Sequence, residues 1–164
     1  MIHLVCGSTG AGKTTHAVKL AREQGALHLS IDDWMVGLFT PDKPARPDWQ
    51  WIDERVQRCE RRMVATALEV ARLGVPAVLD LGLQRADQRR RVAAPALAAG
   101  LAVQLHFIDV DVEERWRRVE NRNAEKGETF RLAVTRPMFD FIETIWQPPD
   151  ADEMAALNGR RVAA

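Results

Sequence analysis

Residues 7–15, with the sequence GSTGAGKTT, contain the residue types that a phosphate-binding loop requires. The first eight match the pattern G-x-x-x-x-G-K-[S/T] in full, between an apolar run and a helical pattern. Glycines let such a loop turn its amides toward phosphate oxygens, and the helix that follows directs its positive end at them. Lys13 is expected to reach the outer phosphates, and the Thr14 hydroxyl to ligate Mg²⁺. The sequence therefore predicts a site for a nucleoside triphosphate, formed by Gly7, Ser8, Thr9, Gly10, Ala11, Gly12, Lys13, Thr14 and Thr15.

Two adjacent acids, Asp32 and Asp33, follow the second apolar run of the chain. In open α/β sheets ligands bind at the carboxyl ends of the strands, so these acids are expected beside the phosphate loop. A carboxylate there can accept the proton of an attacking hydroxyl during phosphoryl transfer, and Asp32 is the preferred candidate for this base. The alternative is helix capping, because S-I-D-D-W before a short helix is also a capping sequence. The two roles are compatible, and Asp33 and Trp34 are predicted to contact the acceptor.

Asp80 ends a third apolar run, in the sequence AVLDLGL. P-loop proteins hold an acid at this place near magnesium or its water shell. A carboxylate that directly follows a buried strand needs a partner, which a metal ion or a substrate supplies. Asp80 is therefore predicted to bind Mg²⁺ together with Thr14, or to bind the acceptor. The alternative is a polar residue that caps a turn at the edge of the sheet.

An arginine-rich segment, DVEERWRRVENRN, occupies residues 111–123 and has helical spacing. Arg115, Arg118 and Arg122 recur on one face, and cations so placed can close over phosphates and neutralise charge as it moves. Arg122 is the first candidate for this role and Arg118 the second. The alternative is a solvated face whose arginines pair with glutamates of the same helix. A second arginine run, residues 89–91, is expected at the surface, and the histidines show no metal-ligand spacing.

These residues must be positioned by strands and helices that alternate along the chain. Apolar runs predict strands over residues 2–6, 26–31, 75–83 and 102–110. Apolar residues at three- and four-residue spacing predict helices over residues 13–23, 49–74, 87–100, 111–123 and 138–146. The alternation predicts an α/β fold, with a parallel sheet of about five strands and helices on both faces.

Two segments do not fit this alternation. Residues 34–51 are rich in proline and tryptophan and are predicted to form an irregular excursion on the substrate side, ending where Asp48 can cap the next helix. Residues 151–164 are rich in alanine and are predicted to be partly frayed.

Length and charge limit the class of protein. A chain of 164 residues is expected to form one domain, and 46% apolar with 28% charged residues is the balance of a soluble globular protein. Lys and Arg together total 23, and so do Asp and Glu. The chain therefore has no excess of positive charge, which disfavours a long nucleic acid as partner. No segment resembles a signal peptide or a membrane span. Cys6 and Cys59 occur in apolar patterns, so both are expected to be reduced residues of the core. A cytoplasmic protein is expected.

Taken together, the motifs GSTGAGKTT, LSIDDWM, VLDLGLQRADQRRR and FIDVDVEERWRRVENRN resemble those of the small P-loop kinases. These kinases are grouped with the ATP-binding AAA-domain proteins, the zeta toxins and the phage-type polynucleotide kinases. The resemblance implies a P-loop NTPase fold of the nucleotide-kinase type, a three-layer sandwich, with ATP as donor and Mg²⁺. It also implies that Asp32 is the general base, that Asp80 holds substrate or metal, and that a lid over residues 111–136 supplies Arg122 and Arg118.

The resulting hypothesis is an ATP-dependent kinase that transfers the γ-phosphoryl group to a hydroxyl of a small molecule. Lys13, Asp32 and Arg122 are its predicted catalytic residues. One alternative is a nucleotide-gated binding protein or slow ATPase, and another is a polynucleotide or nucleotide-sugar kinase of zeta-toxin type. The zero net charge disfavours a long polymer, and residues 34–51 offer apolar walls for a small molecule. The identity of the acceptor and the oligomeric state stay open.

Overall fold

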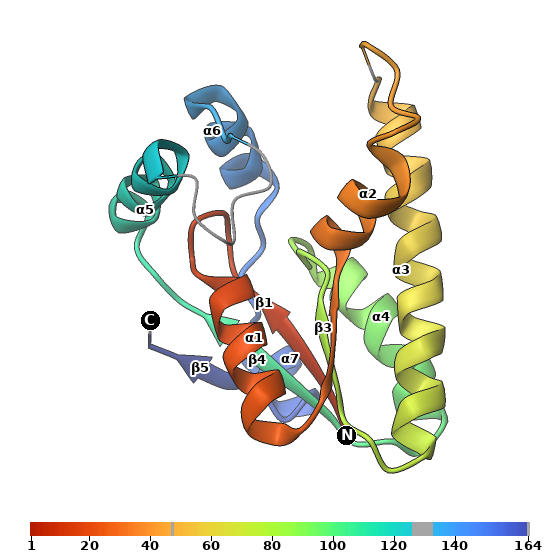
Figure 1. Ribbon diagram of the computed structural model, residues 1–164. Helices are drawn as coiled ribbons and strands as arrows, with labels where there is room; N and C mark the ends of the chain where they lie inside the picture. The colour runs from red at the N-terminus through yellow and green to blue at the C-terminus, as the bar shows by residue number, and fades with distance from the viewer. Residues whose placement is uncertain (47, 126–132, 164) are drawn as a thin grey trace.

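A parallel sheet of five strands forms the centre of the computed structural model, which describes residues 1–46, 48–125 and 133–163 (Figure 1). The strand order is β2-β3-β1-β4-β5, and every neighbouring pair is parallel. The strands are β1 (Ile2–Cys6), β2 (Leu27–Ser30), β3 (Ala77–Asp80), β4 (Val103–Ile108) and β5 (Arg160–Val162). The predicted α/β fold with about five parallel strands is therefore confirmed.

Helices cover both faces of this sheet, so the molecule has three layers (Figure 1). One face is packed by α1 (Lys13–Gln24), and the other by α3 (Trp49–Arg72) and α4 (Ala86–Ala98). Three further helices, α2 (Ile31–Phe39), α5 (Val112–Glu125) and α6 (Arg136–Ile145), lie beyond the carboxyl ends of the strands. The short helix α7 (Ala151–Ala156) leads into β5.

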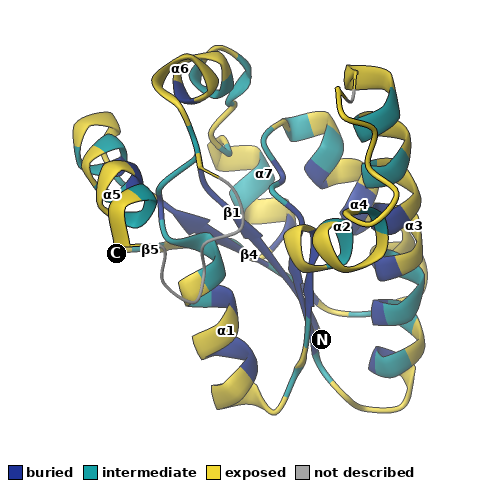
Figure 2. Ribbon diagram, turned by 45° about the horizontal axis from the view of Figure 1, so that its top comes forward, coloured by how far each residue is buried: buried dark blue, intermediate teal, exposed yellow. Residues whose placement is uncertain are grey.

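Strands β1, β3 and β4 are almost entirely buried because helices cover both of their faces. In β1, Leu4 and Cys6 belong to the large core cluster under α3 and α4, whereas Val5 belongs to the smaller cluster under α1. In Figure 2 the central strands β1, β3 and β4 are the continuously buried part of the molecule, while α2, α5 and α6 are largely exposed. Cys6 and Cys59 are buried and unpaired, as predicted.

Three histidines form a hydrogen-bonded chain on the α1 side of the sheet. His3 Nδ1 of β1 lies 3.1 Å from His106 Nε2 of β4, and His106 Nδ1 lies 3.0 Å from His16 Nε2 of α1. Burial, followed by the neighbouring His3, lowers the pKa of His106 to about 3. The chain therefore connects two central strands to the helix that follows the phosphate loop.

The prediction that residues 34–51 are irregular is wrong for residues 34–39, which belong to α2, and for residues 49–51, which belong to α3. The segment up to Phe39 is helical because Ile31, Met35 and Phe39, at four-residue spacing, pack with the apolar core shared with α3. Only residues 40–48 lie between α2 and α3, and all prolines of residues 34–51 fall within this short connection. Asp48 does cap α3, because its Oδ1 accepts a hydrogen bond from Trp51 N at 2.7 Å.

The prediction of a frayed end is also wrong. Asp150 caps α7 through Glu153 N at 2.8 Å, and β5 then pairs in parallel with β4. Arg89, expected at the surface, is fully buried, and its Nε and Nη2 donate to the two carboxylate oxygens of Glu153 at 2.6 and 2.8 Å. This buried ion pair fixes α7 to α4. Among the described residues, no helix is both long enough and apolar enough to cross a membrane.

Candidate active site

The phosphate loop connects β1 to α1, and the backbone conformation explains why two of its residues are glycine. Gly12, the N-cap of α1, has φ 94°, and Gly10 has φ 81°, in the left-handed region that favours glycine. A Cβ atom at Gly10 would lie 2.4 Å from the carbonyl oxygen of Arg115 on α5. The loop therefore needs glycine both for its turn and for the close approach of α5.

Lys13 begins α1 and lies within the loop. Its Nζ donates a hydrogen bond to the carbonyl oxygen of Ser8 at 3.0 Å. Desolvation lowers the pKa of the Lys13 amine, and the negative charges of Asp80 and Asp32 oppose that shift. The ammonium group thus stands close enough to both predicted acids to feel their charge.

A cluster of side chains from α5 and α6 holds the other side of the loop. Ser8 Oγ donates to Glu143 Oε1 at 2.5 Å, and Arg115 donates from Nη1 and Nη2 to the two oxygens of Glu143, both at 2.6 Å. Arg115 also donates to the carbonyl oxygens of Val110 and Thr9. The hydrogen bonds from Arg115 and then Ser8 lower the pKa of Glu143, against the opposing effect of burial.

These hydrogen bonds give one arginine of the arginine-rich helix a structural role that differs from the predicted phosphate contact. Arg115, predicted to share a face with the phosphate-binding arginines, is buried and fixes the loop to α6 instead. Glu143 was missed because its partners lie 28 and 135 residues away in the sequence, so no local pattern marks it.

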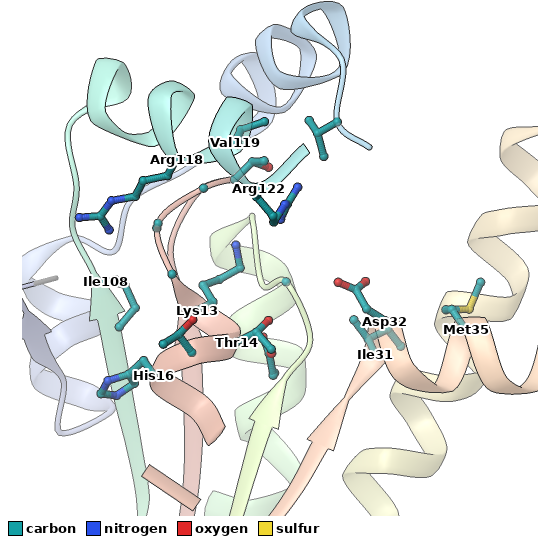
Figure 3. A pocket seen from close by; sticks show the side chains of 18 of the residues that line it. Lys13, Thr14, His16, Ile31, Asp32, Met35, Ile108, Arg118, Val119 and Arg122 are labelled. Carbon is teal, nitrogen blue, oxygen red and sulfur yellow. The ribbon is translucent and has the colours of Figure 1, made fainter. Parts of the chain in front are cut away.

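Asp32 lies in the first turn of α2 and is not its cap. The cap is Ser30, whose Oγ accepts a hydrogen bond from Asp33 N at 3.3 Å. The cap of α2 is therefore Ser30, and both acids lie in the first turn of the helix. In Figure 3 the Asp32 carboxylate points from α2 toward the side of the cleft that carries Lys13 and Thr14.

The charges around Asp32 influence its protonation. Partial desolvation in the cleft and then the negative charge of Asp80 raise the pKa of Asp32, while Lys13 and Arg122 oppose the shift. A raised pKa makes the carboxylate a stronger base than an ordinary surface aspartate.

A cleft of about 1190 Å³ brings together predicted residues from four parts of the chain. Its lining contains loop residues Thr9 to Thr15, Asp32, Asp80, Arg118 and Arg122. An apolar side is formed by α2 and α3, through Met35, Val36, Phe39, Trp51, Ile52 and Val56.

Four of the predicted residues do not line the described cleft. Gly7 and Ser8 lie at the base of the loop. Trp34 packs against the core, and Asp33 lies beside it on α2. The predicted acceptor contacts of Asp33 and Trp34 stay predictions.

An aromatic contact outside the cleft lining joins α3 to α6. The ring of Trp49, at the start of α3, lies 5.9 Å from the ring of Phe141 on α6, measured between centroids. Both side chains are largely exposed. The contact joins the helices that carry the apolar wall to the helices that lie over the phosphate loop.

Asp80 ends β3, between the strand that leads to Asp32 and the strand that leads to the loop. It is 5% exposed and lines the cleft together with Thr14. Its Oδ2 lies 3.8 Å from His28 Nε2, which has no hydrogen-bond partner within the described residues. Hard oxygen donors suit Mg²⁺, which commonly takes one or two protein ligands and completes its shell with phosphates and water. Thr14 and Asp80 fit such an ion, although the described residues contain no cluster of three or more acids, histidines or cysteines suited to hold a metal alone.

The two candidate arginines of α5 differ in their surroundings. Arg122 points into the cleft between Lys13 and Asp32 (Figure 3), and its Nε is buried without a hydrogen-bond partner in the described part of the chain. Burial lowers the pKa of Arg122, and Asp32 opposes that shift. Arg118 points away from Asp32, and its Nε donates to Glu114 Oε1 at 2.7 Å. The geometry supports Arg122 ahead of Arg118; residues 126–132 of the predicted lid lie outside the described residues.

The five-stranded parallel sheet and the glycine-rich loop at the start of α1 define a P-loop nucleotide-binding protein. The family model described as AAA domain matches residues 2–141. The chain therefore belongs to the AAA domain family. The comparison with curated proteins finds no match.

Solved structures share the fold at low sequence identity. Kti12 of Chaetomium thermophilum, in complex with ADP-AlF3, has a TM-score of 0.73 and 16% identity, over 99% of this chain and 89% of that chain. A sugar kinase from Janibacter sp. HTCC2649 has a TM-score of 0.63 and 16% identity, over 99% and 84% of the two chains. A gluconokinase from Sinorhizobium meliloti 1021 has a TM-score of 0.59 and 16% identity, over 98% and 81%. These similarities confirm the predicted three-layer fold of the P-loop kinases.

Proposed function

We propose that this protein is an ATP-dependent kinase that transfers the γ-phosphoryl group to a hydroxyl group of a small molecule. The observation that carries the proposal is the position of Asp32, whose carboxylate faces the phosphate loop across a shared cleft (Figure 3). Lys13 and Arg122 line the same cleft and supply positive charge between the loop and that carboxylate.

Each of these groups has a part in the transfer. The acceptor hydroxyl oxygen forms a bond to the γ-phosphorus while the bond from that phosphorus to the β–γ bridging oxygen breaks, and ADP leaves. Asp32 takes the proton that the hydroxyl loses, for which a raised pKa is an advantage. Lys13 and Arg122 neutralise charge that builds up on the phosphoryl and bridging oxygens.

Thr14 and Asp80 would hold Mg²⁺ through oxygen atoms, Asp80 directly or through water. A bound ion of this kind neutralises phosphate charge and orients the phosphates. The ammonium group of Lys13 donates to the carbonyl oxygen of Ser8 at 3.0 Å, and we expect it to contact the outer phosphates of bound ATP.

The apolar side of the cleft favours transfer over hydrolysis alone. A nucleotide-gated binding protein or slow ATPase needs only a water molecule next to the last phosphate and has no use for an apolar wall, whereas α2 and α3 line the cleft with six apolar side chains. Such a wall suits a small organic acceptor. The names of the sugar kinase and the gluconokinase that share the fold support a hydroxylated small molecule as acceptor.

The test is phosphoryl transfer from [γ-³²P]ATP to a library of hydroxylated metabolites and antibiotics. We expect ATP turnover to rise sharply with at least one compound, and label to be recovered on it. Turnover that no compound increases, with all label released as inorganic phosphate, would show that the protein is an ATPase.

A further inference from the structure

Gln84 lies in the connection between β3 and α4, where the backbone is unusual. The preceding residue, Leu83, has φ 46°, a left-handed conformation that is unfavourable for a residue with a branched side chain. Its side chain is completely buried in the core, and its carbonyl oxygen accepts a hydrogen bond from Arg89 Nη1 at 3.1 Å. Such strain persists only where the surroundings enforce it, and it is concentrated at functional sites.

The main chain of Gln84 is fixed on both sides. Its amide donates to Gln88 Oε1 at 3.1 Å, and its carbonyl oxygen accepts from Gln147 N at 2.9 Å. Gln88 in turn donates from Nε2 to the buried Glu60 at 3.0 Å. Helices α3 and α4 and the segment after α6 therefore hold the residue in place.

The side-chain oxygen of Gln84 has no hydrogen-bond donor among the residues that the structure describes. Gln84 lines the cleft that contains Lys13 and Asp32, and its Oε1 is buried without a hydrogen-bond partner among the described residues. Leaving a buried amide oxygen without a donor is unfavourable, so native proteins rarely do so unless a ligand or water completes the bond.

The sheet order brings Gln84 to the edge of the sheet that also carries Asp32 and the phosphate loop. Gln84 follows β3, which lies between β2, leading to Asp32, and β1, leading to the phosphate loop. The amide therefore lies in the same cleft as Asp32 and Lys13, where the acceptor of the proposed transfer would bind. A carbonyl oxygen accepts hydrogen bonds and repels phosphate oxygens, which are also acceptors.

We propose that Gln84 binds the acceptor, by accepting a hydrogen bond from a second hydroxyl group next to the one that is phosphorylated. The acceptor is then a polyhydroxylated compound, a sugar or a polyol, and not the phosphate-flanked end of a nucleic acid. This inference rests on the proposed kinase function. Asp32 receives the proton of the reacting hydroxyl, while Gln84 fixes its neighbour.

The test compares three classes of probe with [γ-³²P]ATP: neutral monosaccharides and polyols, the sugar acid D-gluconate, and an oligonucleotide with a free 5′-hydroxyl. We expect transfer to at least one sugar, polyol or sugar acid. Transfer to the oligonucleotide alone would overturn the acceptor class but leave the kinase function standing. If neither the probes nor any compound of the wider library receives label, both the acceptor class and the kinase function are overturned.

Variants then test the residue with the best sugar, polyol or sugar-acid probe. Gln84→Leu, which keeps the volume and removes the oxygen, should raise the acceptor KM about tenfold or more, with the KM for ATP and the affinity for a fluorescent ADP analogue changed less than twofold. Gln24→Leu, an exposed glutamine on α1, is the matched control. An acceptor KM in Gln84→Leu equal to that of the control, in a variant with normal unfolding, would overturn the assignment.

Discussion

The proposed chemistry at the residue scale depends on one carboxylate of an adjacent pair. Asp32 lines the cleft and has a raised pKa, whereas Asp33 lies outside the cleft lining and its backbone amide donates to the cap residue Ser30. The difference follows from helical geometry, because consecutive residues of α2 point about 100° apart. Two acids that look equivalent in the sequence are therefore not equivalent in space.

We predict that Asp32→Asn keeps nucleotide affinity but slows phosphoryl transfer by about 10²-fold or more, since the proton acceptor is lost. Transfer is measured with labelled ATP, and affinity with a fluorescent ADP analogue. Asp33→Asn is the matched comparison and should slow transfer far less than Asp32→Asn, because Asp33 is not among the residues that line the cleft. If Asp33→Asn loses transfer while Asp32→Asn keeps it, the base is the other member of the pair.

We predict that Lys13→Ala lowers turnover by about 10²-fold or more, because the cation that neutralises the outer phosphates is removed. Turnover and nucleotide affinity are both measured. Lys13→Arg keeps the charge but not the compact shape and should recover only part of the rate. A normal rate in Lys13→Ala would contradict the phosphate-loop assignment.

The sequence predicts some site residues better than others for a physical reason. The loop from Gly7 to Thr15 is predictable because its function needs fixed residue types at fixed short spacing. Gln84 and Glu143 follow no such pattern, because their roles arise only when distant segments meet in the fold. The burial of Arg115 was not predicted, because helical periodicity does not distinguish a solvent-exposed face from one that another helix covers.

At the scale of elements, α6 is connected to the phosphate loop by the cluster of Ser8, Arg115 and Glu143. Arg115 is almost entirely buried, so it depends on Glu143 for its counter-charge. The position of the loop and the docking of α6 are therefore coupled.

We predict that Glu143→Gln lowers the free energy of unfolding by about 3 kcal/mol, since it leaves a buried guanidinium without its carboxylate. We also expect weaker nucleotide binding, because Ser8 loses its strong acceptor. Urea denaturation and titration with a fluorescent ADP analogue measure the two effects. Asp140→Asn, which breaks an exposed pair with Arg136 on the same helix, is the control and should change little. Equal stability of the two variants would contradict the coupling.

Element prediction succeeded where apolar periodicity was strong and failed where it was weak. The four apolar strands and the long helices were recognisable because burial imposes their patterns. Strand β5 was missed because its residues, Arg160 to Val162, are largely exposed and polar, so its pairing with β4 leaves no apolar signal. Helix α2 was missed because nearby prolines and tryptophans suggested irregular structure beyond the residues they occupy.

At the scale of the whole molecule, the chain of His3, His106 and His16 connects β1, β4 and α1. The pKa of His106 is lowered from 6.5 to about 3, with burial as the largest cause and His3, His16 and Arg160 contributing. Burial also lowers the pKa of His3 and of His16. These imidazoles stay neutral in the fold at a pH where the unfolded chain already binds their protons.

We predict that the free energy of unfolding falls as the pH is lowered below about 6.5, because the unfolded state then binds more protons than the folded state. The slope approaches about 1.4 kcal/mol per pH unit for each such histidine and continues down to the folded pKa, about 3 for His106. His106→Gln should reduce the slope between pH 6 and pH 4. Urea denaturation at several pH values is the measurement, and an unchanged slope in the variant would exclude His106 as its source.

The ring contact between Trp49 and Phe141 holds the first turn of α3 against α6, outside the cleft lining. An aromatic pair stabilises a contact by about 1 kcal/mol, which corresponds to an equilibrium of about fivefold in favour of the joined state. About one molecule in six is therefore expected to have the two rings apart at any moment, so this contact alone does not fix α6 relative to α3.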